Sequence, residues 1–118
     1  MSDAGRMLVL ARRRVADEFS DRLGSDELAA FDDPYEALEA LGSGGWSSVI
    51  IAASYTGLPG LCRAARKLQT DARLIVLCGP GSEPEVRELA APVVAGSVID
   101  DYFIHPLTEN EWRALAPE

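Results

Sequence analysis

Four short apolar runs in this chain end at residues that stand where an α/β domain usually carries its reactive groups. The runs end at Ala11–Arg12, Ala52, Cys78 and His105. In open sheets with helices on both faces, ligands bind just beyond the carboxyl ends of the strands, so these residues are candidates for a functional rim. They include no carboxylate, no nucleophile paired with a base and no metal-ligating cluster. The pattern therefore favours recognition over catalysis.

Three of these positions could still have a chemical role, but in each case we favour a purely structural interpretation. The basic run Arg12–Arg14 opens a helix whose free N–H groups attract anions, but solvated or ion-paired side chains also explain it. Cys78 is interpreted as a buried, inert thiol, with a redox-active thiol as the alternative. His105 is interpreted as a hydrogen-bonded loop residue and not as a pH-sensitive group or metal ligand, because it is the only histidine.

Composition narrows the function classes further. A chain of 118 residues, 47% of them apolar, is long enough for one domain with its own core. The net charge of −8 argues against direct binding of nucleic acid or of an anionic membrane. No apolar stretch approaches the roughly 20 residues of a membrane helix. No signal peptide is recognised, so we expect a cytoplasmic, reducing location in which Cys62 and Cys78 stay free.

Strand-like and helix-like patterns alternate along the chain and predict its fold class. Short apolar runs predict strands, apolar residues at helical spacing predict helices, and two Ser/Thr-x-x-Glu capping boxes mark helix starts. Five strands that alternate with five helices predict an α/β, three-layer fold around a parallel sheet with right-handed crossovers. The strands are expected within 7–10, 27–31, 49–51, 74–77 and 98–104, and the helices within 12–23, 32–41, 58–68, 82–90 and 108–115.

The most specific stretch is Asp-Asp-Tyr-Phe-Ile-His-Pro-Leu at 100–107. It resembles the tail of the receiver domains of bacterial two-component response regulators, CheY-like proteins, where a lysine precedes the proline. Tyr-Glu-Ala-Leu at 35–38, the run at 49–51 and Gly-Leu-Pro-Gly-Leu at 57–61 support the resemblance. It implies a flavodoxin-like, doubly wound sheet of strand order 2-1-3-4-5 over about residues 5–116, after a tail at 1–4. It also implies a cis peptide before Pro106.

The resemblance places the family's reactive positions on residues that cannot do the family's chemistry. The acidic pair that holds Mg²⁺ in receivers falls on Ala11 and Arg12, and the phosphate-accepting aspartate falls on Ala52. The Ser/Thr falls on Cys78 and the lysine on His105. A methyl group cannot form an acyl phosphate, which excludes transfer to Ala52. The resemblance thus implies a degenerate receiver, or pseudo-receiver.

The metal site is expected to fail independently of the phosphate acceptor. Mg²⁺ requires hard oxygen ligands, and here a methyl and a guanidinium stand in their place. If Arg12 points into the site, it would repel the ion by roughly 8 kcal/mol at about 4 Å and an effective dielectric of about 20. No metal and no cofactor is therefore expected.

The resemblance also locates a candidate partner-binding face near the last strand and helix. Its residues here are Tyr102, Ile104 and Trp112, although a packing anchor is the favoured interpretation of Trp112. In receivers, the aromatic residue at the position of Tyr102 responds to the Ser/Thr, and Cys78 replaces that trigger by a weak hydrogen-bonding group. Pro92 is expected to interrupt the fourth helix and to reshape this face.

Three functions remain open from the sequence. The first is a phosphorylation-incompetent receiver-like module that acts in bacterial signal transduction by binding protein: a fused output domain, another receiver as a dimer, or a phosphorelay component. The alternative is a ligand sensor in which Arg12, the start of the first helix and the Cys78–Gly79 turn bind a small anionic metabolite. A small flavodoxin-like enzyme ranks last, because no acid–base pair converges on the rim. The sequence leaves open whether the chain is a truncated domain or the N-terminal part of a longer protein.

Overall fold

A five-stranded parallel sheet of order β2-β1-β3-β4-β5 forms the centre of the computed structural model. The structure describes residues 6–23, 28–69, 71–79, 81, 83–90 and 98–115. The strands are β1 (Met7–Leu10), β2 (Leu28–Phe31), β3 (Ser48–Ala52), β4 (Arg73–Cys78) and β5 (Asp101–Ile104). The predicted flavodoxin-like fold and its strand order are therefore confirmed.

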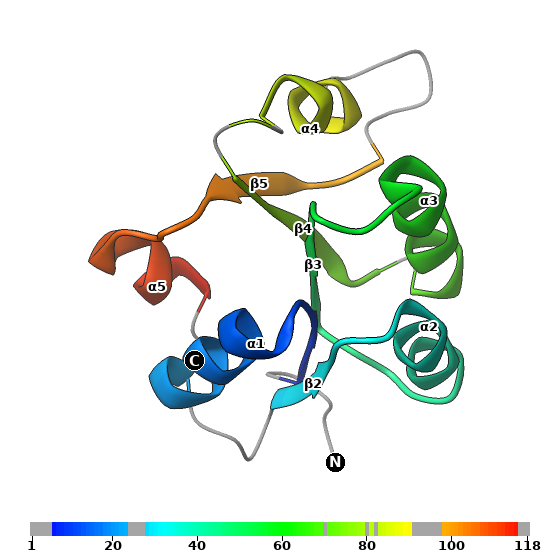
Figure 1. Cartoon of the computed structure of the whole chain (residues 1–118). Coiled ribbons are helices and arrows are strands. Elements are labelled where there is room, and N and C mark those ends of the chain that lie inside the picture. The colour runs from blue at the N-terminus through cyan, green and yellow to red at the C-terminus, as the bar shows by residue number, and fades with distance from the viewer. Residues whose placement is uncertain are drawn as a thin grey trace.

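Helices cover both faces of this sheet, which produces the three predicted layers. Helices α1 and α5 lie on one face, and α2 and α3 lie on the other (Figure 1). The helices are α1 (Arg13–Leu23), α2 (Pro34–Gly42), α3 (Leu58–Leu68), α4 (Glu83–Ala90) and α5 (Glu109–Leu115). Because helices cover both faces, the inner strands can be apolar along their whole length. All four residues of β1 are buried, as are Leu74 to Cys78 of β4.

The register of the sheet brings the carboxyl ends of the strands to one edge. Leu10 pairs with Ile51, Ala52 with Leu77, and Cys78 with Ile104. The pairing continues past the strand ends, since the N–H of Ala53 donates to the carbonyl of Leu77 at 2.8 Å. The N–H of His105 likewise donates to the carbonyl of Cys78 at 2.9 Å. Residues that follow β3, β4 and β5 are thereby held close together.

Local sequence signals fix where several helices begin. The Asp33 side chain accepts a hydrogen bond from the N–H of Tyr35 at 3.2 Å and caps α2, with Pro34 in its first turn. The predicted capping box before α5 is present. Its two bonds join Thr108 N–H to Glu111 Oε1 at 2.9 Å and Glu111 N–H to Thr108 Oγ1 at 3.2 Å. Ser82 of the other predicted box, and Pro92, lie outside the described residues.

Some expected boundaries differ from those in the structure. Helix α1 begins at Arg13, one residue later than expected, whereas β5 lies within the range 98–104 that was expected to contain it. Asp100, just before β5, is already bonded to β4, because its N–H donates to the carbonyl of Leu74 at 2.8 Å. Its carboxylate also accepts from the N–H of Leu74 at 2.8 Å and from Arg66 at 2.7 Å, and we call this set of bonds the Asp100 clamp. The His105–Pro106 peptide is cis, as predicted.

In the described part of the chain, no helix is both long and apolar enough to cross a membrane.

Candidate functional site

A small pocket lies at the carboxyl ends of β3 and β4, and we call it the rim pocket. Its volume is about 170 Å³. It brings together three of the residues singled out from the sequence, which are Ala52, Cys78 and His105. The lining residues are Val15, Ala52, Ala53, Ser54, Leu77, Cys78, Gly79 and His105. The register of β3, β4 and β5 explains this convergence, because each of the three residues ends or follows one of these strands.

The chemistry available in the rim pocket is limited. No residue that lines it carries a carboxylate, and the side chain of Ala52 is a methyl group in a residue only 8% exposed. Cys78 is fully buried, with its Sγ 3.5 Å from the carbonyl oxygen of Phe103. Among the described residues, no group of three or more His, Cys, Asp or Glu side chains could hold a metal ion. The pocket therefore lacks the hard oxygen ligands that Mg²⁺ prefers.

His105 is held at the rim pocket by a partner on α1. Its Nε2 lies 2.9 Å from Oε1 of Glu18, and both side chains are about one-third exposed. His105 is therefore a hydrogen-bonded loop residue, as favoured from the sequence. Ser54 also lines the pocket, but no hydrogen bond joins it to His105 within the described part of the chain. The pocket thus shows no activated nucleophile.

Ala11 and Arg12, the other two positions of interest, do not line the rim pocket. Ala11 is fully buried in the core. The guanidinium of Arg12 lies over the ring of Tyr55, with Cζ 4.5 Å from the ring centroid. The expected repulsion of a metal ion by an inward-pointing Arg12 therefore does not apply. The reason is that the electron-rich face of Tyr55 attracts the cation away from the rim pocket.

Tyr55, on which Arg12 packs, is itself buried and hydrogen-bonded. The residue is 6% exposed, and its hydroxyl donates to the carbonyl of Asp32 at 2.9 Å. Burial raises the pKa of the Tyr55 phenol, whereas the nearby Arg12 cation lowers it. The pKa is raised overall, so the side chain is a neutral wall that its hydrogen bond to Asp32 holds in place.

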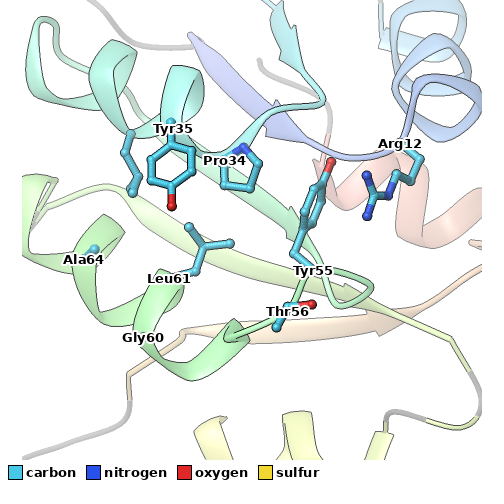
Figure 2. Close-up of a pocket in the computed structure, with 9 residues that line it drawn as sticks. Arg12, Pro34, Tyr35, Tyr55, Thr56, Gly60, Leu61 and Ala64 are labelled. Atoms are coloured by element: carbon cyan, nitrogen blue, oxygen red, sulfur yellow. The ribbon is translucent and has the colours of Figure 1, made fainter.

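A larger pocket of about 520 Å³ lies between α2 and α3, and we call it the α2–α3 pocket. Figure 2 shows Arg12 beside one face of the Tyr55 ring, with Pro34, Tyr35 and Leu61 on the other side of that ring. Among its residues, only Arg12 was a candidate binding residue from the sequence. The lining residues are Arg12, Pro34, Tyr35, Leu38, Tyr55, Thr56, Gly60, Leu61 and Ala64.

The residues of the anion site that was the alternative from the sequence are distributed over two pockets. That alternative joined Arg12 to the Cys78–Gly79 turn, but Arg12 lines the α2–α3 pocket and the turn lines the rim pocket. The three groups therefore do not form one site. The sequence signal that could have indicated the α2–α3 pocket is the helical spacing of apolar residues in both helices. This spacing places apolar side chains between the two neighbouring helices.

The candidate partner-binding face is only partly exposed. Ile104 is 39% exposed and Tyr102 is half-buried. Trp112 is 4% exposed and packs edge-to-face on Phe19 of α1, with ring centroids 4.7 Å apart. Trp112 is therefore a packing residue between α5 and α1, which was one of its two sequence interpretations, and it does not belong to that face.

Comparisons with known proteins place this fold among receiver domains. No protein-family model matches the sequence, and no curated protein matches it. A receiver domain protein (CheY-like) from Methanospirillum hungatei is similar, with a TM-score of 0.75, 18% identity and coverage of 94% of this chain and 89% of that one. An adenylate cyclase from Rhodopirellula baltica has a TM-score of 0.78 and 16% identity over 94% of this chain and 83% of that one.

A third similar structure carries a phosphoryl group. It is a response regulator from Burkholderia pseudomallei that contains a phosphorylated aspartic acid, a calcium ion and citrate. The TM-score is 0.68 at 19% identity, over 93% of this chain and 65% of that one. At such low identities, these likenesses show that the chain has the receiver fold.

Proposed function

We propose that this chain is a receiver-like signalling module that cannot be phosphorylated and that acts by binding another protein. Its surface is then presented in one fixed conformation. The proposed module covers residues 5–116. Its partner is a fused output domain, a second receiver domain or a component of a phosphorelay.

The observation that carries this proposal is the composition of the rim pocket. The Burkholderia pseudomallei response regulator contains a phosphorylated aspartic acid and a calcium ion. Here the corresponding residue by sequence resemblance is Ala52, which lines the rim pocket beside Cys78 and His105. Neither an oxygen nucleophile that could form an acyl phosphate nor a carboxylate ligand for the metal lines this pocket. Both requirements for transfer are absent.

The remaining contacts of the rim favour a fixed conformation. His105 is bonded to Glu18, and the Sγ of the buried Cys78 lies 3.5 Å from the carbonyl oxygen of Phe103 in β5. A surface near Tyr102 and Ile104 would then be presented without a phosphorylation signal. The signalling role is carried over from proteins that share the fold, and fold alone does not fix function.

The direct test is incubation of the chain with acetyl phosphate and Mg²⁺, followed by intact-mass measurement. The Ala52→Asp variant is the sharper sample, because it supplies the acceptor but not the metal ligands. We expect no added phosphoryl group on either protein, while a phosphorylatable receiver in the same mixture gains one. A phosphoryl group located in the rim pocket of either protein would overturn the proposal.

Protein binding through the proposed face is tested by a pair of surface substitutions. Ile104→Asp alters that face, and Leu68→Asp is a matched control because Leu68 is 44% exposed at the end of α3. Sedimentation velocity over a concentration series measures self-association, the simplest such interaction. We expect Ile104→Asp to weaken association and Leu68→Asp to leave it unchanged. The reverse pattern would place the interface on α3.

A further inference from the structure

The α2–α3 pocket has the size and position of a ligand site. Its volume of about 520 Å³ is three times that of the rim pocket, at about 170 Å³, and small-molecule sites usually occupy about 300–1,000 Å³. It lies beside the carboxyl ends of β1 and β3, which are neighbours in the sheet although β2 lies between them in sequence. Such a switch in strand order is where open α/β sheets bind their ligands.

The walls of this pocket suit a flat, apolar molecule. Leu38 from α2 and Leu61 from α3 supply aliphatic surface, and the rings of Tyr35 and Tyr55 supply aromatic surface. The Tyr35 ring is 81% exposed and points toward the space that Pro34 and Leu61 border (Figure 2). Aromatic rings pack well against such surfaces in stacked or edge-to-face geometry.

The pocket also has room for a larger side chain at one of its lining residues, Gly60. A Cβ built on Gly60 would meet no atom within 4 Å. Gly60 lies in the first turn of α3 and lines the pocket. Gly60 is exposed, so a larger side chain at this position would clash with nothing and would add bulk at the opening of the pocket.

Charge in the pocket selects an acid with a single negative charge. Arg12 is the one charged residue that lines it, and among the described residues Arg12 forms no ion pair. A carboxylate could bind the guanidinium through charge-assisted hydrogen bonds. Asp32 and Asp33 lie close enough to Tyr55 to add to the rise in its pKa that burial mainly causes. Their negative charge would oppose a dianion such as phosphate more than a monocarboxylate.

We propose that the α2–α3 pocket binds a small aromatic monocarboxylic acid. The ring lies between the apolar walls of α2 and α3, against the face of Tyr55 that is turned away from Arg12. The carboxylate reaches the guanidinium of Arg12 past the edge of the Tyr55 ring, since both residues line the pocket. This inference does not depend on the rim pocket, because no residue lines both pockets. The chain would then respond to a metabolite through the face of the sheet opposite α1 and α5.

The test is a calorimetric titration of the whole chain with naphthylacetate, with naphthylacetamide and acetate as matched probes. Amide chemical shifts in NMR spectra locate the site. We expect saturable binding of naphthylacetate, with shifts centred on Tyr55 and Leu61, and much weaker binding of the neutral amide and of acetate. Equal binding of acid and amide would overturn the role of Arg12, and no saturable binding in the millimolar range would overturn the site.

Two variants and one control sharpen this result. Arg12→Gln should weaken binding about fivefold, the size of an exposed ion pair, whereas Arg13→Gln should change it less than about twofold because Arg13 does not line the pocket. Gly60→Leu should abolish binding, and its thermal melting curve checks that the domain still folds. Equal losses in Arg12→Gln and Arg13→Gln would contradict the proposal, as would undiminished binding by a folded Gly60→Leu protein. Phosphorylation assays remain unaffected by all three, so the two proposals fail separately.

Discussion

The rim pocket and the α2–α3 pocket open near the same edge of one sheet, but they are built differently. Residues at or just beyond the ends of strands line most of the rim pocket, and the sheet holds Ala52 and Cys78 in place. Helix residues line most of the α2–α3 pocket, and Gly60 and the exposed Tyr35 leave it open. The first has a fixed shape and little reactive chemistry, whereas the second has space, apolar walls and one cation. The two pockets of this sheet edge therefore differ in both shape and chemistry.

The largest expected difference comes from placing the same carboxylate in each pocket. Cys78→Asp would bury a charge at a fully buried position, so we expect it to lower the free energy of unfolding by about 4 kcal/mol. Gly60→Asp should change it by no more than about 0.5 kcal/mol, because the site is exposed and an acid suits the first turn of a helix. Urea denaturation measures both. Similar losses would show that the two pockets are equally closed.

Removal of the Tyr55 side chain, which lines the α2–α3 pocket, should cause the next largest loss in the free energy of unfolding. Tyr55→Ala deletes a buried ring and a hydrogen bond to Asp32, so we expect a loss of about 3 kcal/mol. Tyr55→Phe keeps the ring and should cost only about 1 kcal/mol. Chemical denaturation of the two variants separates packing from hydrogen bonding. A Phe variant as unstable as the Ala variant would show that the hydroxyl bond dominates.

The stabilisation of the fold by the bonds of the Asp100 carboxylate, just before β5, should depend on pH. Burial raises the pKa of Asp100, but hydrogen bonds from Leu74 and Arg66 outweigh burial, and the pKa is lowered from its ordinary value of 3.8. A lowered pKa stabilises the fold above that ordinary value, and the stabilisation is lost as pH falls through the folded-state value. Because the carboxylate is half-exposed, water screens the effect to at most about 1 kcal/mol.

The Asp100→Asn variant tests this dependence. We expect it to be less stable than the unchanged protein near neutral pH, with the difference shrinking as the pH falls below the ordinary carboxyl range. Thermal melting measured from neutral to acid pH provides the comparison. A difference that stays constant across this range would mean that the charge of Asp100 contributes nothing.

The smallest expected effect concerns the open space beside Gly60. Gly60→Ala should stabilise the domain by about 0.5 kcal/mol, since alanine suits a helix and its Cβ meets nothing within 4 Å. Gly57→Ala is the matched control. Gly57 has a φ of +74°, so alanine there should destabilise by about 1 kcal/mol. Differential scanning calorimetry compares the two, and a destabilised Gly60→Ala protein would contradict an open pocket.

Much of the fold follows from local sequence patterns, whereas the direction of side chains at the rim does not. The continuous apolar run in β4 and the Thr108–Glu111 capping box predict elements that the structure contains. The convergence of Ala52, Cys78 and His105 follows from parallel strands that end at one edge. Local patterns of this kind depend on neighbours within a few residues, which the sequence displays.

The features that sequence reasoning missed depend on contacts between distant segments. Arg12 turns toward Tyr55, and Glu18 bonds to His105. For Trp112 the sequence indicated a packing role but not its partner, which is Phe19 of another helix. A side-chain rotamer is chosen by the charge and shape of such partners, and spacing along one helix or strand does not reveal them. The α2–α3 pocket was missed for the same reason, since two helices form it together.

The central claim is that the rim pocket cannot hold a phosphoryl group and its metal ion. The most direct measurement is an NMR titration of the chain with beryllofluoride, a phosphoryl mimic, in the presence of Mg²⁺. We predict no saturable shift of the amides of Ala52, Cys78 and His105. Saturable shifts centred on these three residues, absent when Mg²⁺ is omitted, would contradict the account.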